Sequence, residues 1–278
     1  MNAFWPRSIA MMLVVLQSSL QLTGQSGIAP DREKLRSLIG RAETGDIQAQ
    51  FEIGNVHRLR EGVQLDHMEA VRWYRNAAER GLAEAELMLG VMYFKGDGIQ
   101  KDDVESTRRF RKAADHGHGV SQFILATRYE RGVGVPQDYG QSALWFRKAA
   151  EQGYIEAQRI IARKYNDGQG ISQDYSEAAR WYRQAAELGD PLSCGALGFS
   201  YLNGRGVLKD YLAAYVWFSL EEATLSPARR RKFQWEDVRE KVAGHMTSLQ
   251  LTEAERRVRG WKPKPGGKNL SDVLSSLF

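Results

Sequence analysis

Apolar side chains recur at helical spacing along most of this chain, and the same arrangement returns at a fixed interval. Between Ala157 and Gly189, apolar residues at i, i+3, i+4 and i+8 predict one amphipathic helix, formed by Ala157, Ile160, Ile161 and Tyr165. A second helix is predicted where the spacing returns, at Ala178, Trp181, Tyr182, Ala185 and Ala186. The pattern therefore predicts a pair of helices.

This helix pair is repeated every 36 residues without an insertion. Five units open at Ala49, Ala85, Ser121, Ala157 and Ser193. Self-similarity at a fixed period of this size is typical of stacked repeats, in which each unit buries its apolar face against its neighbours. The Gly-x-Gly of "YNDGQGISQDY" recurs with the period, so we interpret it as a turn between helices and not as a phosphate-binding loop.

Turn and cap residues recur with the same period. Two glycines end the first helix in four of the units, because glycine reaches positive φ at low cost. An aspartate follows where it can cap the second helix, with Glu or Gln three residues later in four of the five units, as in a capping box. The tryptophan of the second helix is expected to lie in the core. These structural positions are Asp66, Gly96, Gly98, Asp102, Gly132, Gly134, Asp138, Gly168, Gly170, Asp174, Gly204, Gly206, Asp210, Trp73, Trp145, Trp181 and Trp217.

The recurring pattern A-x-x-x-L-G-x-x-Y-x-x-G-x-G-V-x-x-D-x-x-x-A-x-x-W-Y-x-x-A-A-x-x-G resembles the Sel1-like repeat family, which is related to the tetratricopeptide repeats. The resemblance covers Ala49 to about Ala223. "RAETGDIQ" resembles the end of an earlier repeat, and "MTSLQLTEAERRVRGW" resembles the helix that often closes such arrays. The resemblance implies an all-α fold, a right-handed solenoid of about five 36-residue helix-turn-helix repeats with a helical C-terminal cap.

Three units depart from this pattern. Arg60 stands where later units have the first turn glycine, Arg109 replaces the tryptophan, and Glu221-Glu222 replaces an alanine pair. End units are expected to differ because one of their faces has no neighbour. Arg109 lies inside the array, and the sequence leaves open what covers it.

The positive charge is concentrated near the C-terminus. The whole chain has a formal net charge of +5, and residues 226–278 contain 12 Lys and Arg against 6 Asp and Glu. The run Arg229-Arg230-Arg231-Lys232 is compatible with nucleic acid, an anionic membrane or an acidic protein. We favour a solvated helix face, because acidic residues follow the run and no nucleic-acid-binding motif accompanies it.

The N-terminus has the order of a secretory signal peptide. Arg7 precedes the apolar run Ile9–Leu16, which is too short to span a bilayer and is followed by polar and small residues. Gly24 and Ser26 satisfy a small-x-small cleavage rule. We expect export, to the periplasm in a bacterium. A buried N-terminal helix and a cytosolic scaffold are the alternatives.

The expected organisation has five parts. It comprises a signal peptide at 1–26, a linker and partial repeat at 27–48, five repeats at 49–224, basic capping helices at 225–262 and a flexible linker with a short amphipathic tail at 263–278. The apolar stripe of the tail is suited to docking on the chain's own repeats, on a partner or at a membrane surface, and we favour the first.

Signals for catalysis, metals and cofactors are weak. Cys194 is the only cysteine, so no internal disulfide forms, and the chain departs from cysteine-rich Sel1-like proteins reported to bind or hydrolyse β-lactams. Cys194 stands where other units have Gln or Glu, which is compatible with partial exposure or with a small residue packed in the helix. His116 and His118 offer two imidazoles where a stable zinc site needs three or four ligands. We predict no catalytic residue, metal or cofactor.

What remains is the surface of the first helices, which in similar repeat proteins lines a concave face that holds a partner. Positions that vary between units are candidate contacts: Asn55, Val91, Thr127, Arg128, Arg163, Lys164 and Phe199.

The resemblance implies a non-enzymatic scaffold or adaptor, in this layout often a periplasmic regulator that holds a sensor or envelope protein. The alternative is a secreted protein that binds or hydrolyses β-lactams or cell-wall fragments. We expect a monomer that binds protein and no nucleic acid, with peripheral membrane contact through the tail as an option.

Overall fold

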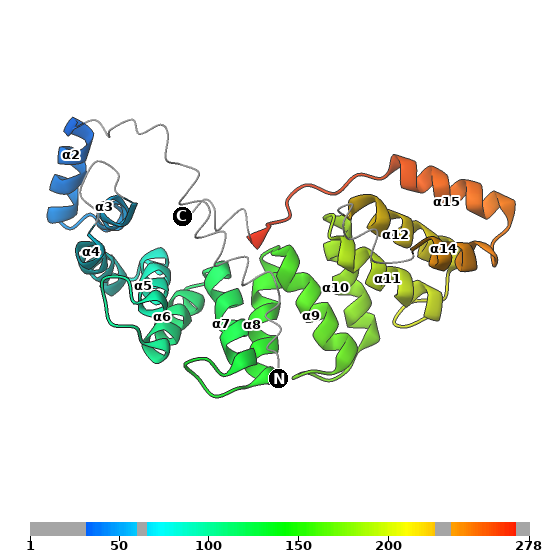
Figure 1. Ribbon diagram of the computed structural model, residues 1–278, viewed down its shortest axis with the longest axis horizontal. Helices are drawn as coiled ribbons and strands as arrows, with labels where there is room; N and C mark the ends of the chain where they lie inside the picture. Colours follow the sequence, from blue (N-terminus) through cyan, green and yellow to red (C-terminus); the bar gives the residue numbers. More distant parts are fainter. Residues whose placement is uncertain (1–31, 60–65, 226–234, 271–278) are drawn as a thin grey trace. The chain divides into compact units, whose positions relative to one another are not determined.

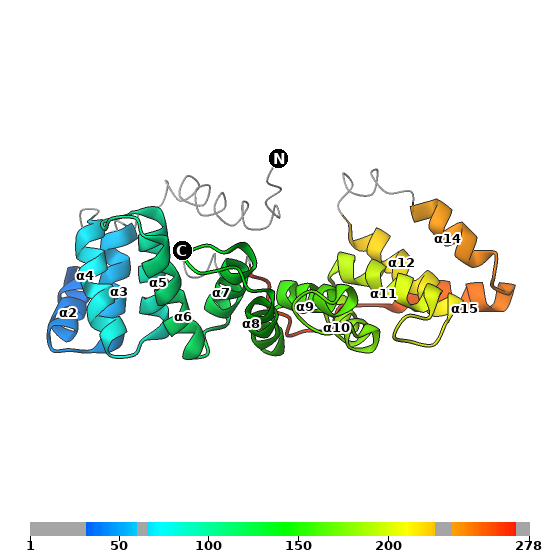
Figure 2. The same ribbon diagram turned by 90° about the horizontal axis from the view of Figure 1, so that it is seen from below.

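The computed structural model describes residues 32–59, 66–225 and 235–270, and these residues fold as α-helices joined by turns and loops (Figures 1 and 2). Among them, the β-type pairing is one isolated parallel bridge between Tyr154 and Lys268, drawn as the arrow near the end of the described chain in Figure 1. The expected signal peptide, the basic run Arg229-Arg230-Arg231-Lys232 and the residues after Leu270 lie outside this description.

Five pairs of helices follow one another along the chain. The first helices of the pairs are α3 (Ile47–Leu59), α5 (Ala83–Lys95), α7 (Gly119–Arg131), α9 (Ile155–Asp167) and α11 (Pro191–Asn203). The second helices are α4 (His67–Glu79), α6 (Asp103–Asp115), α8 (Tyr139–Glu151), α10 (Tyr175–Glu187) and α12 (Tyr211–Thr224). Before them comes α2 (Arg32–Glu43), and after them come α14 (Trp235–Ala243) and α15 (Ser248–Gly260). The all-α fold of tandem helix pairs that the sequence predicts is confirmed.

The chain divides into two compact units. Among the described residues, the first unit extends to Gln137 and the second runs from Asp138 to Leu270. In the first unit, α3 packs against α4 and α5 against α6; in the second, α9 packs against α10 and α11 against α12.

Each second helix begins at a capping aspartate. The side chains of these residues accept hydrogen bonds from backbone N–H groups of the first turn, at Asp66, Asp102, Asp138, Asp174 and Asp210. In a capping box, the Glu105 side chain would accept a hydrogen bond from the backbone N–H of Asp102. The Glu105 carboxylate instead forms an ion pair with Arg108 at 2.6 Å. The complete box occurs at Thr247 and Gln250, where α15 begins.

The turn between the paired helices needs both of its glycines. Gly168 ends α9 in the left-handed region, and its N–H bonds to the carbonyl of Lys164. Gly170 has φ of +74°, and a Cβ there would lie 2.1 Å from the Tyr139 carbonyl oxygen. The turn therefore packs directly on the start of α8. The same close approach recurs at Gly98, Gly134 and Gly206.

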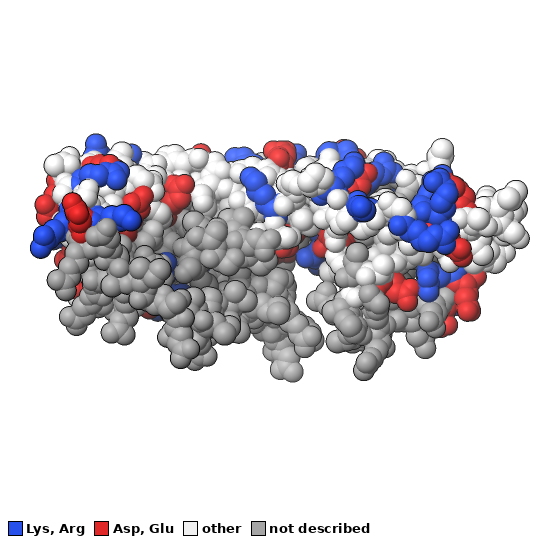
Figure 3. Space-filling view, turned by 90° about the horizontal axis from the view of Figure 1, so that it is seen from above, with Lys and Arg blue, Asp and Glu red and all other residues white. Residues whose placement is uncertain are grey.

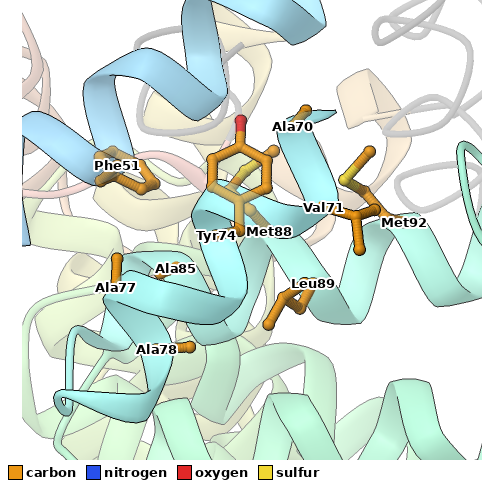
Figure 4. Close-up of a cluster of buried hydrophobic side chains, with 10 residues drawn as sticks. All are labelled: Phe51, Ala70, Val71, Tyr74, Ala77, Ala78, Ala85, Met88, Leu89 and Met92. Atoms are coloured by element: carbon orange, nitrogen blue, oxygen red, sulfur yellow. The ribbon is translucent and has the colours of Figure 1, made fainter. Parts of the chain in front are cut away.

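Aromatic rings of the second helices fill gaps left by small residues of the first helices. In the first unit, Tyr74 lies in a cluster with Phe51, Met88, Leu89 and Met92, and Figure 4 shows its ring within this cluster. A Cβ at Gly54 would lie 2.6 Å from the Tyr74 ring. Gly90 and Phe110 repeat this fit at 2.7 Å, and Gly198 and Phe218 do so in the second unit. This glycine-to-ring contact fixes the spacing of these three helix pairs.

A glutamine in the first helix ties it to the preceding second helix. The side-chain amide of Gln50 donates to the carbonyl of Ala42 at 3.2 Å, and that of Gln158 donates to Ala150 at 3.3 Å. Cys194 takes this position in the fifth repeat, with its Sγ 3.9 Å from the Ala186 oxygen. Cys194 is fully buried, which excludes partial exposure and agrees with the alternative of a small residue packed in the helix.

Arg109 and Glu86 depart from the repeat pattern together. Glu86 replaces the glutamine and is 2% exposed. Arg109 replaces the tryptophan, and its guanidinium forms an ion pair with the Glu86 carboxylate at 3.1 Å. Arg109 also binds Glu105 at 2.7 Å. The stripe at Arg109 is therefore covered by an ion-pair network and not left open.

The end of the described chain folds back over the second unit. After α15, residues 261–270 run across the turns that precede α11 and α9 (Figure 1). The Lys264 N–H donates to the Glu187 carbonyl at 2.7 Å, and the Lys268 N–H donates to Gly153 at 2.9 Å. Leu270 is buried, and its N–H donates to the Glu156 carboxylate at 3.2 Å. The charged side chains of α14 and α15 lie at the same end of the chain, with both signs interspersed (Figure 3).

Candidate functional site

The candidate contacts of the first unit are partly used for internal bonding. The Asn55 side chain accepts a hydrogen bond from the Tyr74 hydroxyl at 2.7 Å, and the Thr127 hydroxyl donates to the Phe123 carbonyl at 3.0 Å. Val91 packs against the cluster around Phe110. These three side chains are half-buried, so they offer only a limited surface to a partner.

Arg128 and Lys164 are buried, which corrects the expectation that they are open to a partner. Arg128 is 7% exposed, and its guanidinium lies over the rings of Phe94 and Phe110. It also donates to the Ser106 hydroxyl at 3.1 Å. Long cationic side chains bury their stems readily, and burial lowers the pKa of Arg128.

Lys164 is 0% exposed and lies between two aromatic rings. Its Nζ is 5.5 Å from the Tyr139 ring centroid and 5.7 Å from that of Phe146. It donates to the Gln169 side chain at 3.3 Å. Both Arg128 and Lys164 therefore hold helices together.

Arg163 and Phe199 are exposed and occupy equivalent positions of α9 and α11. Four further side chains complete this surface: Arg159 and Ile160 of α9, and Leu192 and Ala196 of α11. Leu192 is 40% exposed and Phe199 is 44% exposed. We call the surface formed by Arg159, Ile160, Arg163, Leu192, Ala196 and Phe199 the α9–α11 face.

The α9–α11 face contains a small cavity. Its volume is about 150 Å³, and it is lined by Arg159, Ile160, Arg163, Tyr182, Leu192 and Ala196. Tyr182 contributes from α10, and burial raises the pKa of its hydroxyl to about 12. The hydroxyl is therefore neutral at physiological pH and cannot serve as a base there.

The two arginines of the cavity differ in their partners. Arg159 faces the Asp190 carboxylate at 3.3 Å, and Asp190 in turn caps α11 through the Ser193 N–H. The Arg163 side chain forms no hydrogen bond or ion pair with any described residue. Arg163 is thus the open cationic group of this cavity.

A second cavity lies between α12, α14 and α15. Its volume is about 360 Å³, and its lining includes Tyr215, Ser219, Glu222, Arg239 and Arg259. Glu222 and Arg239 pair at 2.9 Å across it. Its positive and negative side chains largely offset each other, so its charge selects no particular ligand.

Nothing in the described part of the chain assembles a metal centre, because no three His, Cys, Asp or Glu side chains converge there. His118 instead begins α7, where its Nδ1 accepts the Ser121 N–H at 3.2 Å. Burial raises the pKa of the Cys194 thiol, which makes it a poor nucleophile.

A buried carboxyl lies beneath the α9–α11 face. Glu221 of α12 is 4% exposed, and it occupies the space that a Cβ at Gly195 would need. Burial, together with the nearby charge of Asp190, raises the pKa of Glu221 to about 8. Glu221, which replaces the first alanine of the repeat's alanine pair, therefore packs inside the fifth repeat against Gly195.

Alignment of the five repeats could have identified Arg159 and Gly195, which occupy equivalent positions in the fourth and fifth repeats. The equivalent residues of the first three repeats are Phe51, Leu87 and Phe123. A cation and then a glycine at an otherwise bulky apolar position mark a local change of surface. Leu192 gives a weaker signal, because its equivalent position is occupied by both polar and apolar residues.

The chain matches the family model of the Sel1 repeat over residues 47–82, 83–118, 119–154, 155–190 and 191–220. No curated protein is a match. Among the described residues, none of the helices combines the length and apolar character needed to cross a membrane.

Solved structures of two proteins are similar to this chain. One is a protective antigen present in uropathogenic Escherichia coli strains and displaying an SLR fold, at 32% identity and a TM-score of 0.66; the match covers 81% of this chain and 48% of the antigen. This chain thus spans about half of the antigen's length. The other is a Sel1 repeat protein from Oxalobacter formigenes, at 25% identity and a TM-score of 0.67, with 89% of this chain and 99% of that one covered.

Five consecutive matches cover well over half of the sequence, and their register agrees with the five helix pairs of the structure. The chain therefore belongs to the Sel1 repeat family, whose tandem helix pairs are related to the tetratricopeptide repeats.

Proposed function

We propose that this chain is a non-enzymatic adaptor that binds another protein through the α9–α11 face. Sel1 repeat proteins generally mediate protein–protein interaction and are typically non-catalytic scaffolds. One observation carries the choice of this face. The exposed Leu192 lines one cavity with Arg163, Phe199 is exposed at the repeat position equivalent to Arg163, and the Arg163 guanidinium forms no hydrogen bond or ion pair with the described residues.

The adaptor acts in the cell envelope, where it holds a sensor or envelope protein as a periplasmic regulator. Support for export comes from the N-terminal order of Arg7, the apolar run Ile9–Leu16 and the small residues after it. A reporter enzyme that is active only outside the cytoplasm, fused after Phe278, tests this. Activity that disappears when residues 1–26 are removed supports export, and activity in neither fusion contradicts it.

Site-specific photocrosslinking tests the binding face. A photoreactive phenylalanine analogue at position 199 should give a discrete adduct with one envelope protein. The same analogue at Arg180, an exposed position on the second helix α10, is the matched control. No adduct at either position, or the same adducts at both, would refute binding through this face.

The alternative of a β-lactam hydrolase is tested separately. Sustained turnover of a chromogenic β-lactam by the purified chain would contradict a non-enzymatic role. Turnover that survives the replacement Arg163→Glu would place the chemistry outside the α9–α11 face.

A further inference from the structure

We propose that the partner segment bound by the α9–α11 face carries a carboxylate next to a bulky apolar side chain. This inference rests on the proposed function, because it names the chemistry of the partner that the adaptor would hold. The occupant is a segment of another protein, and its acidic residue meets the arginines while its apolar residue enters the cavity.

The repeat register brings the relevant side chains together. Because α9 and α11 are the same helix of successive repeats, residues 36 positions apart lie at the same level of the two helices. Arg163 is therefore level with Phe199, and Ile160 is level with Ala196. The Arg163–Phe199 level of the face thus presents a cation and an aromatic ring, and the Ile160–Ala196 level presents two apolar side chains.

The cavity has room for one side chain. The volume of about 150 Å³ is lined by the apolar Ile160, Leu192 and Ala196 together with Arg159, Arg163 and Tyr182. A cavity of roughly this size holds a benzene-sized group when its walls are apolar. Ala196 creates the space, because a larger residue at this position would extend into it. A Leu or Phe side chain of a partner fits this description.

Phe199 extends the apolar surface beyond the cavity. Its ring packs edge-on against the buried ring of Phe218, with centroids 4.9 Å apart, so it is held in place while 44% of the residue stays exposed. A fixed, exposed aromatic ring is a typical anchor of protein interfaces, since little conformational freedom is lost on binding.

The charge of the face selects a carboxylate. Arg163 and Arg159 both line the cavity, and only Arg159 already faces an acidic group, Asp190. Asp190 is itself engaged in capping α11. Glu156, one turn before Arg159, accepts the N–H of Leu270. Asp167, one turn after Arg163, accepts a hydrogen bond from the Asn166 side-chain amide at 2.7 Å and forms no ion pair with Arg163. Arg163 is therefore the guanidinium of the cavity that no described carboxylate pairs with, and a guanidinium pairs well with the two oxygens of a carboxylate.

Matched peptides test this recognition directly. Short synthetic peptides anchored by Leu or Phe, and differing only in Glu, Gln or Lys beside the anchor, are titrated into the full chain by fluorescence anisotropy. The Glu peptide should bind about tenfold more tightly than the Gln peptide, and the Lys peptide should bind more weakly than both. Added salt should reduce these differences.

Charge reversal supplies the decisive variant. Arg163→Glu should invert the order so that the Lys peptide binds most tightly. Arg147→Glu on α8, where the Arg147 side chain is 43% exposed and lies 4.0 Å from Glu151, is the matched control and should leave the order unchanged. Circular dichroism of both variants verifies that they fold.

Three results would overturn the inference: no measurable binding of any peptide, equal affinity for the Glu and Lys peptides, or an order that Arg163→Glu does not change. Binding seen only after removal of residues 271–278 would also overturn it, because the chain's own end would then occupy the face. A photocrosslinked envelope partner at position 199 that is insensitive to Arg163→Glu would leave the adaptor function standing and remove only the carboxylate.

Discussion

Glu86 and Arg109 stand where other repeats have glutamine and tryptophan. Because the two side chains form a buried ion pair, we expect the effects of replacing them on the free energy of unfolding to be strongly coupled. Glu86 is 2% exposed and is bound by Arg109 at 3.1 Å and by Lys112 at 3.4 Å. At an effective dielectric constant of about 20, two charges 3.1 Å apart attract each other by about 5 kcal/mol. The cost of removing both from water offsets most of this, so the pair contributes little net stability.

Removing one partner leaves the other charge buried. Arg109→Trp should therefore lower the free energy of unfolding by about 3 kcal/mol, because only the half-exposed Lys112 still neutralises Glu86. Glu86→Gln should cost about 1 kcal/mol, since Arg109 keeps Glu105 at 2.7 Å. The double variant restores the residue types of the other repeats. It should unfold within about 1 kcal/mol of the original chain or be more stable.

Urea denaturation of the four chains measures this cycle, and hydrogen exchange in α5 and α6 localises the effect, because repeat arrays can unfold in parts. The expected coupling energy is at least about 2 kcal/mol. Simple additivity of the two single replacements would refute the reasoning. So would a double variant as unstable as Arg109→Trp, because the buried charge would then not be the cause.

Three further predictions concern the second unit. The pKa of Glu221 is about 8 in the folded chain and about 4.5 unfolded, so the folded state binds more protons between these values and stability falls as pH rises through them. Glu221→Gln should therefore match the original chain near pH 4 and exceed it by up to about 4 kcal/mol near pH 8 in denaturation curves, and parallel pH profiles would contradict this. A chain ending at Trp261 loses the backbone bonds of Lys264 and Lys268 and the burial of Leu270, and should unfold about 3 kcal/mol more easily than one ending at Leu270; equal midpoints would show that the segment contributes nothing. Gly170→Ala should cost at least about 2 kcal/mol in thermal or urea unfolding because its Cβ meets the Tyr139 oxygen, whereas Gly260→Ala, with open space around it, should be near neutral; equal effects would refute the steric argument.

The helices, their caps and their turns follow from the sequence because local rules determine them. An aspartate before an apolar stripe and a glycine after one act within a few residues, so their roles can be inferred without knowing the neighbours. The 36-residue period adds the order of the helix pairs, since each must cover the apolar face of the next.

The burial of Arg128 and Lys164 could not be inferred in this way. Both stand at positions that vary between repeats, which is also the signature of a solvated surface. Their burial depends on aromatic rings from other helices, such as Phe110 and Phe146, that lie over the side-chain stems. Contacts of this kind arise from packing between helices, and a helical pattern read along one segment does not contain them.

The same distinction explains why the α9–α11 face can vary while the fold persists. Caps, turn glycines and small residues that face aromatic rings fix the helices from their ends and their inner sides. The outer side carries none of these contacts, so Arg163 and Phe199 can occupy equivalent positions without disturbing either helix. Beneath the face, Gly195 and Glu221 change together, because the carboxyl fills the space that the missing side chain leaves. The fifth repeat therefore departs from the others in its packing next to the face where its surface also departs. If the proposed recognition is correct, Glu221→Gln should alter stability and leave the peptide preference intact, whereas Arg163→Glu should do the reverse.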